Sequence, residues 1–345
     1  MRILKKGKAL FGFGFLVLLA FVIFGLLGLI FSFAPSTNRY ADEANKLFSS
    51  RDYKGFGEFA KKIGPDSAYK LLKARFPENQ GMAHDFAHVI GLAAYAKQGA
   101  AGLTVCDFAY AYGCFHGFIE GFLAAAGTGV ISQIEQSCTA MGSVHAPSCL
   151  HGIGHGLLAY DGYNLTRALS DCDFLQQGSK TYCFDGVFME RATGSMQTAS
   201  QRFKLTADNL LAPCDVIGEN YKRECWRNQV FNWRVFFGGD MARVGKQCSL
   251  IEKNFQDTCF ENFGISMVLA ANSDAGQIAA LCKTLPDGPA SDKCLGGAMS
   301  ELMFEGKPPN LAQSLCKSFS QQAVSGCSQR FGQLLGEYNL RFAGR

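Results

Sequence analysis

The chain has 345 residues, of which 48% are hydrophobic and 18% charged, and its formal net charge is +4. This is long and apolar enough for a sizeable core and for two or three domains. Basic residues form no run outside the N-terminus, so nothing in the sequence points to nucleic acid as a partner. Cysteine is the outlier: the fourteen cysteines are about twice the number expected in a reduced cytosolic enzyme.

The N-terminus predicts a membrane anchor. Residues 1–8 form a basic flank, and no charged residue follows between Ala9 and Thr37. A helix of about 20 apolar residues spans a bilayer, so residues 9–34 predict one transmembrane helix. A cleaved signal peptide is the alternative, although its apolar region is usually only about 7–15 residues long. The basic flank should stay in the cytoplasm, which places the rest of the chain outside, in a periplasm or on a cell surface.

The cysteines recur as seven pairs. Within each pair the members are about 11 residues apart, and first members recur about every 34 residues, with one insertion of about eight residues within residues 192–200. The simplest disulfides join the two members of each pair, and a link such as Cys114 to Cys138 stays open. The pairs are Cys106 and Cys114, Cys138 and Cys149, Cys172 and Cys183, Cys214 and Cys225, Cys248 and Cys259, Cys282 and Cys294, and Cys316 and Cys327.

Each repeat predicts two helices. The segment after a second cysteine is apolar at helical spacing and ends at a glycine, as in FHGFIEGFLAAAG after Cys114, and a shorter helical segment such as ISQIEQSCTAM leads to the next first cysteine. This repeat length and cysteine placement resemble the secreted, cysteine-rich type of Sel1-like and tetratricopeptide-like proteins. The resemblance implies an architecture only: an all-α αα-hairpin solenoid of about seven 34-residue repeats cross-linked by disulfides, after one N-terminal transmembrane helix.

The predicted organisation follows from these patterns. After the cytoplasmic flank (1–8) and the anchor (9–34), residues 35–80 predict a linker and a polar helical cap. Residues 81–335 predict the disulfide-rich αα-repeat domain, and residues 336–345 a C-terminal tail.

Five of the six histidines recur with the repeat. They form i, i+4 pairs, whose members share one helix face: His84 with His88, His116 with Glu120, and His151 with His155. The next repeat has Asp185 at this position and Glu190 about one turn later, and the later repeats have Arg227, Glu261, Gly296 and Gln329. The sixth, His145, lies outside the period and is not assigned to a site.

These residues predict a metal site. Helices of adjacent repeats pack about 8–10 Å apart, so equivalent side chains should line one groove. Imidazole and carboxylate ligands suit zinc, iron, copper or manganese. An inherited packing role is the alternative, but the later repeats have the same packing needs and no histidine. The predicted ligands are His84, His88, His116, Glu120, His151, His155, Asp185 and Glu190, with Glu120 also a candidate general base.

Three functional classes remain open at this level. The first is a metal-binding protein or metal-dependent enzyme outside the cytoplasmic membrane. The second is a tethered scaffold whose groove binds a peptide or protein through the histidine-bearing face. The third is a structural envelope protein without a site. Convergence of the ring nitrogens on one point would favour metal, and rings spread along the groove would favour the scaffold.

Overall fold

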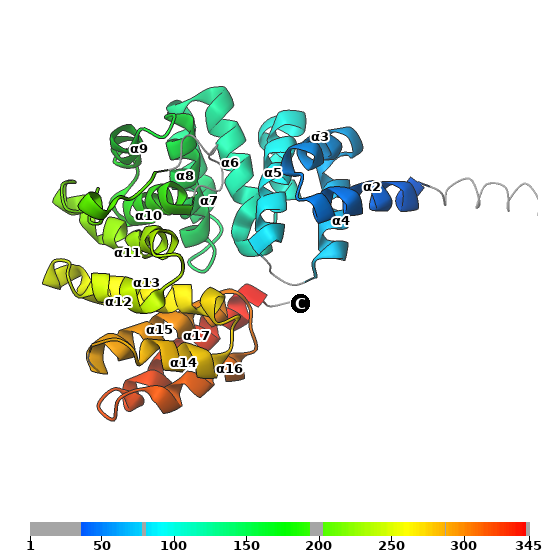
Figure 1. The fold of residues 1–345 in the computed structure, drawn as a ribbon. Coiled ribbons are helices and arrows are strands. Elements are labelled where there is room, and N and C mark those ends of the chain that lie inside the picture. Colours follow the sequence, from blue (N-terminus) through cyan, green and yellow to red (C-terminus); the bar gives the residue numbers. More distant parts are fainter. Residues whose placement is uncertain (1–35, 78–80, 194–202, 287, 343–345) are drawn as a thin grey trace, which may run out of the picture.

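A computed structural model describes residues 36–77, 81–193, 203–286 and 288–342. Throughout these ranges the regular structure is helical and includes no strand, so the all-α prediction is confirmed (Figure 1). The predicted anchor at residues 9–34 lies outside the described residues. Within them, no helix combines the length and the apolar character needed to cross a bilayer.

The first helices form a cap on the repeats. Phe48, Phe56 and Phe86 pack ring against ring, with centroids 4.7–5.1 Å apart, and all three are buried. These contacts fix the start of the stack and the position of the helix that bears His84. The cap helices are α2 (Ser36–Ser50), α3 (Tyr53–Ile63) and α4 (Pro65–Arg75).

A series of long helices forms the body of the molecule. Each packs against the next, and together they follow an arc from the α2–α5 end to the C-terminus (Figure 1). From α6 onward each contains the second cysteine of a pair, usually at least one turn inside the helix rather than at its start. They are α5 (Gly81–Gln98), α6 (Gly113–Ala126), α8 (Ala146–Tyr160), α10 (Gln177–Thr193), α11 (Glu219–Phe236), α13 (Lys253–Ala270), α15 (Gly288–Phe304) and α17 (Val324–Phe342).

Short helices alternate with the long ones and reach the first cysteine of most pairs. Three begin at an Asn or Asp whose side chain accepts a hydrogen bond from the backbone three residues on, namely Asn164, Asp240 and Asp274. The α-helical members are α7 (Ile131–Thr139), α9 (Leu165–Cys172), α12 (Met241–Cys248), α14 (Ala275–Cys282) and α16 (Pro309–Ser314). The 3₁₀ segments are η1 (Gly99–Val105), η2 (Tyr110–Tyr112), η3 (Thr128–Val130), η4 (Ala207–Asn209) and η5 (Leu315–Ser318).

All seven disulfides join the two members of a cysteine pair, as the simplest pairing predicted. The alternative link between Cys114 and Cys138 does not form. Each disulfide ties a short helix or turn to the following long helix, which gives the repeated helix pairs expected of a Sel1-like architecture. Seven disulfides are typical of an oxidising, extracytoplasmic compartment.

Two glycines bring helices of the histidine repeats unusually close together. A Cβ on Gly117 of α6 would lie 1.9 Å from the carbonyl oxygen of His88 on α5, and one on Gly186 of α10 would lie 1.9 Å from that of His151 on α8. No side chain fits at either position, so the backbones are in contact there. Both glycines therefore serve close helix approach.

The end of the stack curls back onto its second repeat. The guanidinium of Arg341 on α17 lies 4.4 Å from the ring of Phe304 and donates a hydrogen bond of 3.4 Å to the carbonyl of Val144. Phe304 in turn stacks near Tyr112, with ring centroids 6.4 Å apart. The helix reaches Phe342, so most of the predicted tail at 336–345 is part of α17. The arc is thus closed by side-chain contacts between its last and early repeats.

Candidate metal centre

Five imidazoles from three successive long helices form one cluster. His116 on α6 is at its centre, because its ring centroid lies 5.1–5.9 Å from those of the other four histidines. Two of these, His84 and His88, come from α5, and His151 and His155 come from α8. Adjacent packing of these helices accounts for the cluster, since side chains four residues apart share a helix face.

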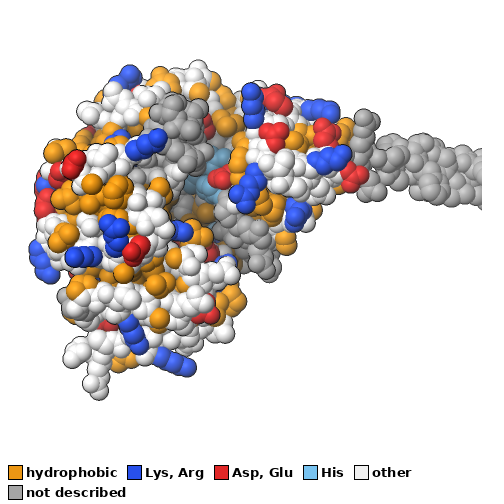
Figure 2. All heavy atoms as spheres, viewed as in Figure 1, with side chains coloured by type: hydrophobic (Ala, Val, Ile, Leu, Met, Phe, Trp, Pro, Cys, Tyr) orange, Lys and Arg blue, Asp and Glu red, His pale blue; other side chains and the backbone are white. Residues whose placement is uncertain are grey.

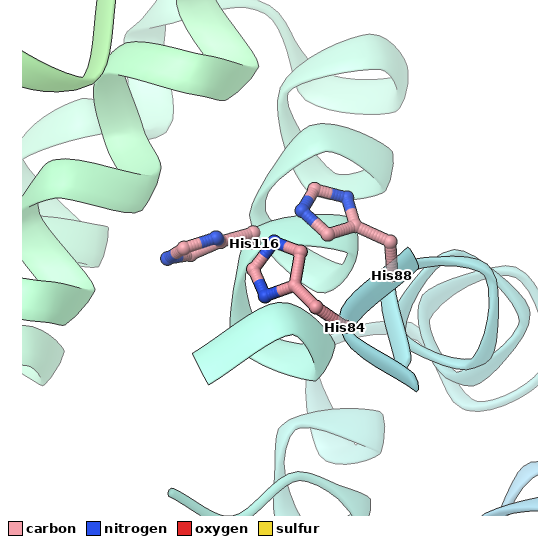
Figure 3. A group of neighbouring side chains, drawn as sticks. All are labelled: His84, His88 and His116. Atoms are coloured by element: carbon pink, nitrogen blue, oxygen red, sulfur yellow. The ribbon is translucent and has the colours of Figure 1, made fainter. Parts of the chain in front are cut away.

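Three of the rings could hold one metal ion. His84, His88 and His116 each offer a ring nitrogen, and the three nitrogens lie within 4.8 Å of one another. Figure 3 shows the three rings gathered between α5 and α6. Ligands of an ion with bonds of about 2.1 Å are about 3.4 Å apart in a tetrahedral site, so the rings would move inward slightly on binding.

Two ring nitrogens of these histidines are buried without a hydrogen-bond partner. They are Nε2 of His88 and Nδ1 of His116, and both side chains are buried. A buried polar atom left without a partner costs roughly 1–3 kcal/mol. A metal ion bound by both nitrogens would remove that cost, so the orphaned atoms fit the proposed ligand role.

His84 is oriented by an unusual backbone segment. Its Nδ1 lies 2.7 Å from the carbonyl oxygen of Tyr110, which accepts the N–H and leaves Nε2 for a ligand. Tyr110, Ala111 and Tyr112 all have positive φ angles, between 49° and 64°. Such a run is strained for residues with a side chain, and strain of this kind concentrates at functional sites.

The other two histidines are backed by carboxylates. His151 Nδ1 lies 3.0 Å from Asp185 Oδ2, and His155 Nδ1 lies 3.0 Å from Glu190 Oε2. The remaining nitrogens of the two rings face each other at 2.9 Å. Asp185 and Glu190, predicted from sequence as metal ligands, therefore contact the histidines directly and orient their rings.

The surroundings favour neutral imidazoles. Burial lowers the pKa of His88 and His116 well below the usual value, and the neighbouring histidines lower both further. Burial also lowers the pKa of His84 and His155, against the opposing effects of the Tyr110 carbonyl and of Glu190. Neutral imidazole is the form that binds metal, so the ligands are in the required protonation state near pH 7.

Two of the predicted carboxylate ligands, Glu120 and Asp185, have pKa values shifted in opposite directions. Burial raises the pKa of Glu120 to about 7, and the nearby Glu190 adds to this shift. Burial also acts to raise the pKa of Asp185, but Arg227, His151 and Asn228 outweigh it and hold the pKa below its usual value. Asp185 is therefore a permanent anion, whereas Glu120 can exchange a proton near neutral pH.

Sequence reasoning missed several supporting residues. Asn228 donates a hydrogen bond of 2.8 Å to Asp185, Tyr163 donates one of 3.5 Å to Glu190, and the Tyr110 carbonyl holds His84. None of these lies at the repeated position, so the period gave no signal for them. Arg227 does lie there, and its Nε is 3.5 Å from Asp185.

His145 lies apart from the cluster, as its place outside the period predicted. Its ring stacks on Phe108, with centroids 3.5 Å apart, and its Nδ1 is 2.7 Å from the Tyr112 hydroxyl. It therefore contributes to packing near the contact that closes the arc.

The cluster lies at the base of a recess. Figure 2 shows histidine surface in the hollow between the lobe formed by α2–α5 and the rest of the molecule. His84 and His151 are partly exposed, whereas His88, His116 and His155 are buried. A small ligand can therefore reach the partly exposed rings of His84 and His151.

Comparison with protein-family models, with curated proteins and with solved structures gave no match.

Proposed function

We propose that this chain is a membrane-anchored, extracytoplasmic helical-repeat protein that binds a divalent transition-metal ion through His84, His88 and His116. The observation that carries the proposal is the meeting of three imidazole rings, two of which also have a buried ring nitrogen without a hydrogen-bond partner. A purely structural cluster would leave those nitrogens unpaired at a free-energy cost. Zinc, copper, iron and manganese all accept such ligands.

A three-histidine site favours catalysis over a structural role. Three protein ligands leave one position of a four-coordinate ion free for water or substrate, which is the arrangement of catalytic zinc sites. A metal bound here would supply Lewis acidity toward that water. Glu120, one helical turn from His116 and with a pKa of about 7, is suited to accept a proton as the general base.

The anchor and compartment complete the proposal. The apolar segment at residues 9–34 would hold the chain in the membrane, with the basic flank in the cytoplasm. The disulfides require an oxidising environment on the far side. The site would then work in a periplasm or at a cell surface.

Elemental analysis of the purified, oxidised full chain tests the proposal. We expect at least one metal ion per chain in the parent and one ion fewer in a His84→Ala/His88→Ala/His116→Ala variant. A His145→Gln variant is the matched control, because it removes the one histidine outside the cluster. Absence of metal from the parent after incubation with zinc, copper, iron and manganese salts would refute the proposal.

A tethered binding scaffold is the second candidate. It is favoured by charged side chains at or next to the repeated position beyond the histidines, where Arg227 faces Asp185 and Arg330 faces Glu261, each at 3.5 Å. Such a row suits an extended peptide carrying both charges. Peptide capture that is unaffected by the triple histidine variant, together with absence of metal, would favour the scaffold.

A further inference from the structure

A second pair of ring nitrogens has the form of a separate metal site. His151 and His155 lie one turn apart on α8, and their Nε2 atoms are 2.9 Å from each other. Their side chains are only 14% and 4% exposed. Neither nitrogen belongs to the group formed by His84, His88 and His116.

The Nδ1 atom of each ring already faces a carboxylate. Asp185 and Glu190 each lie 3.0 Å from an Nδ1 atom, and an ionised carboxylate can only accept a hydrogen bond. With Nδ1 facing the carboxylate in both rings, Nε2 is the nitrogen left to bind a metal. The two Nε2 atoms face each other at 2.9 Å, close enough for one ion to contact both.

The carboxylates are themselves held in place. Asn228 and Arg227 both contact Oδ1 of Asp185, which leaves Oδ2 for His151. Glu190 is fully buried and also receives the hydroxyl of Tyr163. Histidine ligands of metals typically have such support, because it fixes both tautomer and ring orientation.

We propose that His151 and His155 are neighbouring ligands of a second transition-metal ion, and that this ion is of the copper(II) type. Two nitrogens about 2.05 Å from one ion and about 2.9 Å from each other subtend about 90°, whereas a tetrahedral site separates them by about 3.4 Å. Right-angled neighbouring ligands occur in square-planar, tetragonal and octahedral sites, and among the divalent ions that take these geometries copper(II) binds nitrogen ligands most strongly. The remaining positions are open to water or substrate.

A second ion would extend the proposed function from one metal ion to two. This inference rests on the proposed function, because both sites bind metal through imidazole. The rings of His116 and His155 stack with centroids 5.1 Å apart, so the two ions would occupy one buried patch. A centre with two ions can hold one substrate from both sides, which one ion cannot.

Copper loading of the full, oxidised chain tests the inference. After dialysis against copper(II), we expect two copper ions per chain and two electron paramagnetic resonance signals. A His151→Ala/His155→Ala variant should keep one ion and one signal. A His84→Ala/His88→Ala variant should lose the other ion and retain the signal that the first variant lacks. His145→Gln should bind like the parent.

Asp185→Asn separates a direct role from a folding defect, because it keeps both rings and the side-chain volume. We expect 10–100-fold weaker binding of the second ion only. A second outcome is one copper ion per chain, with a signal that the His151→Ala/His155→Ala variant leaves unchanged. That result would show that the two histidines only share a proton. It would overturn this inference and leave the first site in place. No copper in any form of the chain would overturn the proposed function as well.

Discussion

Two pairs of helices, α5 with α6 and α13 with α15, show the same packing with different chemistry. A Cβ on Gly117 would lie 1.9 Å from the carbonyl of His88, and one on Gly297 would lie 1.9 Å from that of Glu261. Both pairs therefore approach until their backbones touch. Close helix approach in this fold thus requires glycine at the contact and places no demand on the residue before it.

The residues beside those contacts differ completely. In the N-terminal pair they are His88 and His116, and in the C-terminal pair Glu261 and Gly296, where the missing side chain leaves room for Arg330. If the histidines served packing, the C-terminal pair would need them too. The comparison therefore favours a chemical role for the imidazoles over an inherited structural one.

Substitution of the contact glycines should have the largest effect. Gly117→Ala and Gly297→Ala each place a methyl group against helix backbone, which cannot yield as a flexible side chain would. We expect each to lower the free energy of unfolding by about 3 kcal/mol. Urea denaturation measures this, and metal analysis should show that only Gly117→Ala weakens the His84, His88 and His116 site.

Gly129→Ala is the control for those two variants. Gly129 is exposed and nothing lies within 4 Å of its added Cβ, so the change should stay within about 0.5 kcal/mol. Equal loss of metal from Gly117→Ala and Gly297→Ala would mean that general loosening, rather than local geometry, controls the site.

The sequence predicted the repeat and the histidine cluster because both depend on period. Cysteine spacing identified the disulfide pairs, and the recurrence of His116 and His151 placed their rings on adjacent helices. Figure 3 shows the part of this cluster on α5 and α6. Period alone could not predict which nitrogen each ring presents. That depends on single contacts, such as the Tyr110 carbonyl at His84 and Asp185 at His151.

Closure of the arc could not be predicted from the sequence either. Each repeat rotates slightly relative to the last, and small rotations accumulate along a solenoid. Arg341 contacts Val144, which lies 197 residues earlier in the chain. No local pattern near either residue indicates the other.

Removal of one disulfide tests whether the two halves of the stack are equally stabilised by their cross-links. Cys172 with Cys183 and Cys282 with Cys294 close loops of similar length, with separations of 11 and 12 residues. Replacement of either pair by alanine should cost about 2–3 kcal/mol of unfolding free energy. Thermal unfolding under non-reducing conditions measures both, and a loss confined to one pair would contradict the equivalence of the repeats.

Glu301 on α15 and Asp185 on α10 should affect the pH dependence of stability in opposite directions, and Glu301 tests the C-terminal half. Burial raises its pKa to about 8, with a further contribution from Glu305. The folded chain therefore holds a proton that the unfolded chain loses above about pH 4.5, so stability falls as pH rises from there to about 8. Glu301→Gln should be about 2 kcal/mol more stable than the parent at pH 9 and equal to it at pH 4.

Melting temperatures of the two proteins across that range measure the effect. A constant difference between parent and Glu301→Gln at every pH would contradict the assignment to this carboxyl. Asp185 in the N-terminal half has a lowered pKa, so its contribution to stability is lost only in acid, as pH falls through that pKa.

The smallest effect is expected at the ion pair that takes the place of the histidines in the C-terminal half. Arg330 and Glu261 are 40% and 35% exposed and 3.5 Å apart, so solvent screens most of their attraction. Arg330→Gln should cost less than about 1 kcal/mol of unfolding free energy and leave bound metal unchanged. The fold would then tolerate loss of a charge in α17, whereas the metal site would not tolerate loss of the imidazole in α6, since that imidazole has a buried nitrogen without a hydrogen-bond partner. Loss of metal from Arg330→Gln would show instead that the charged row and the histidine cluster act as one unit.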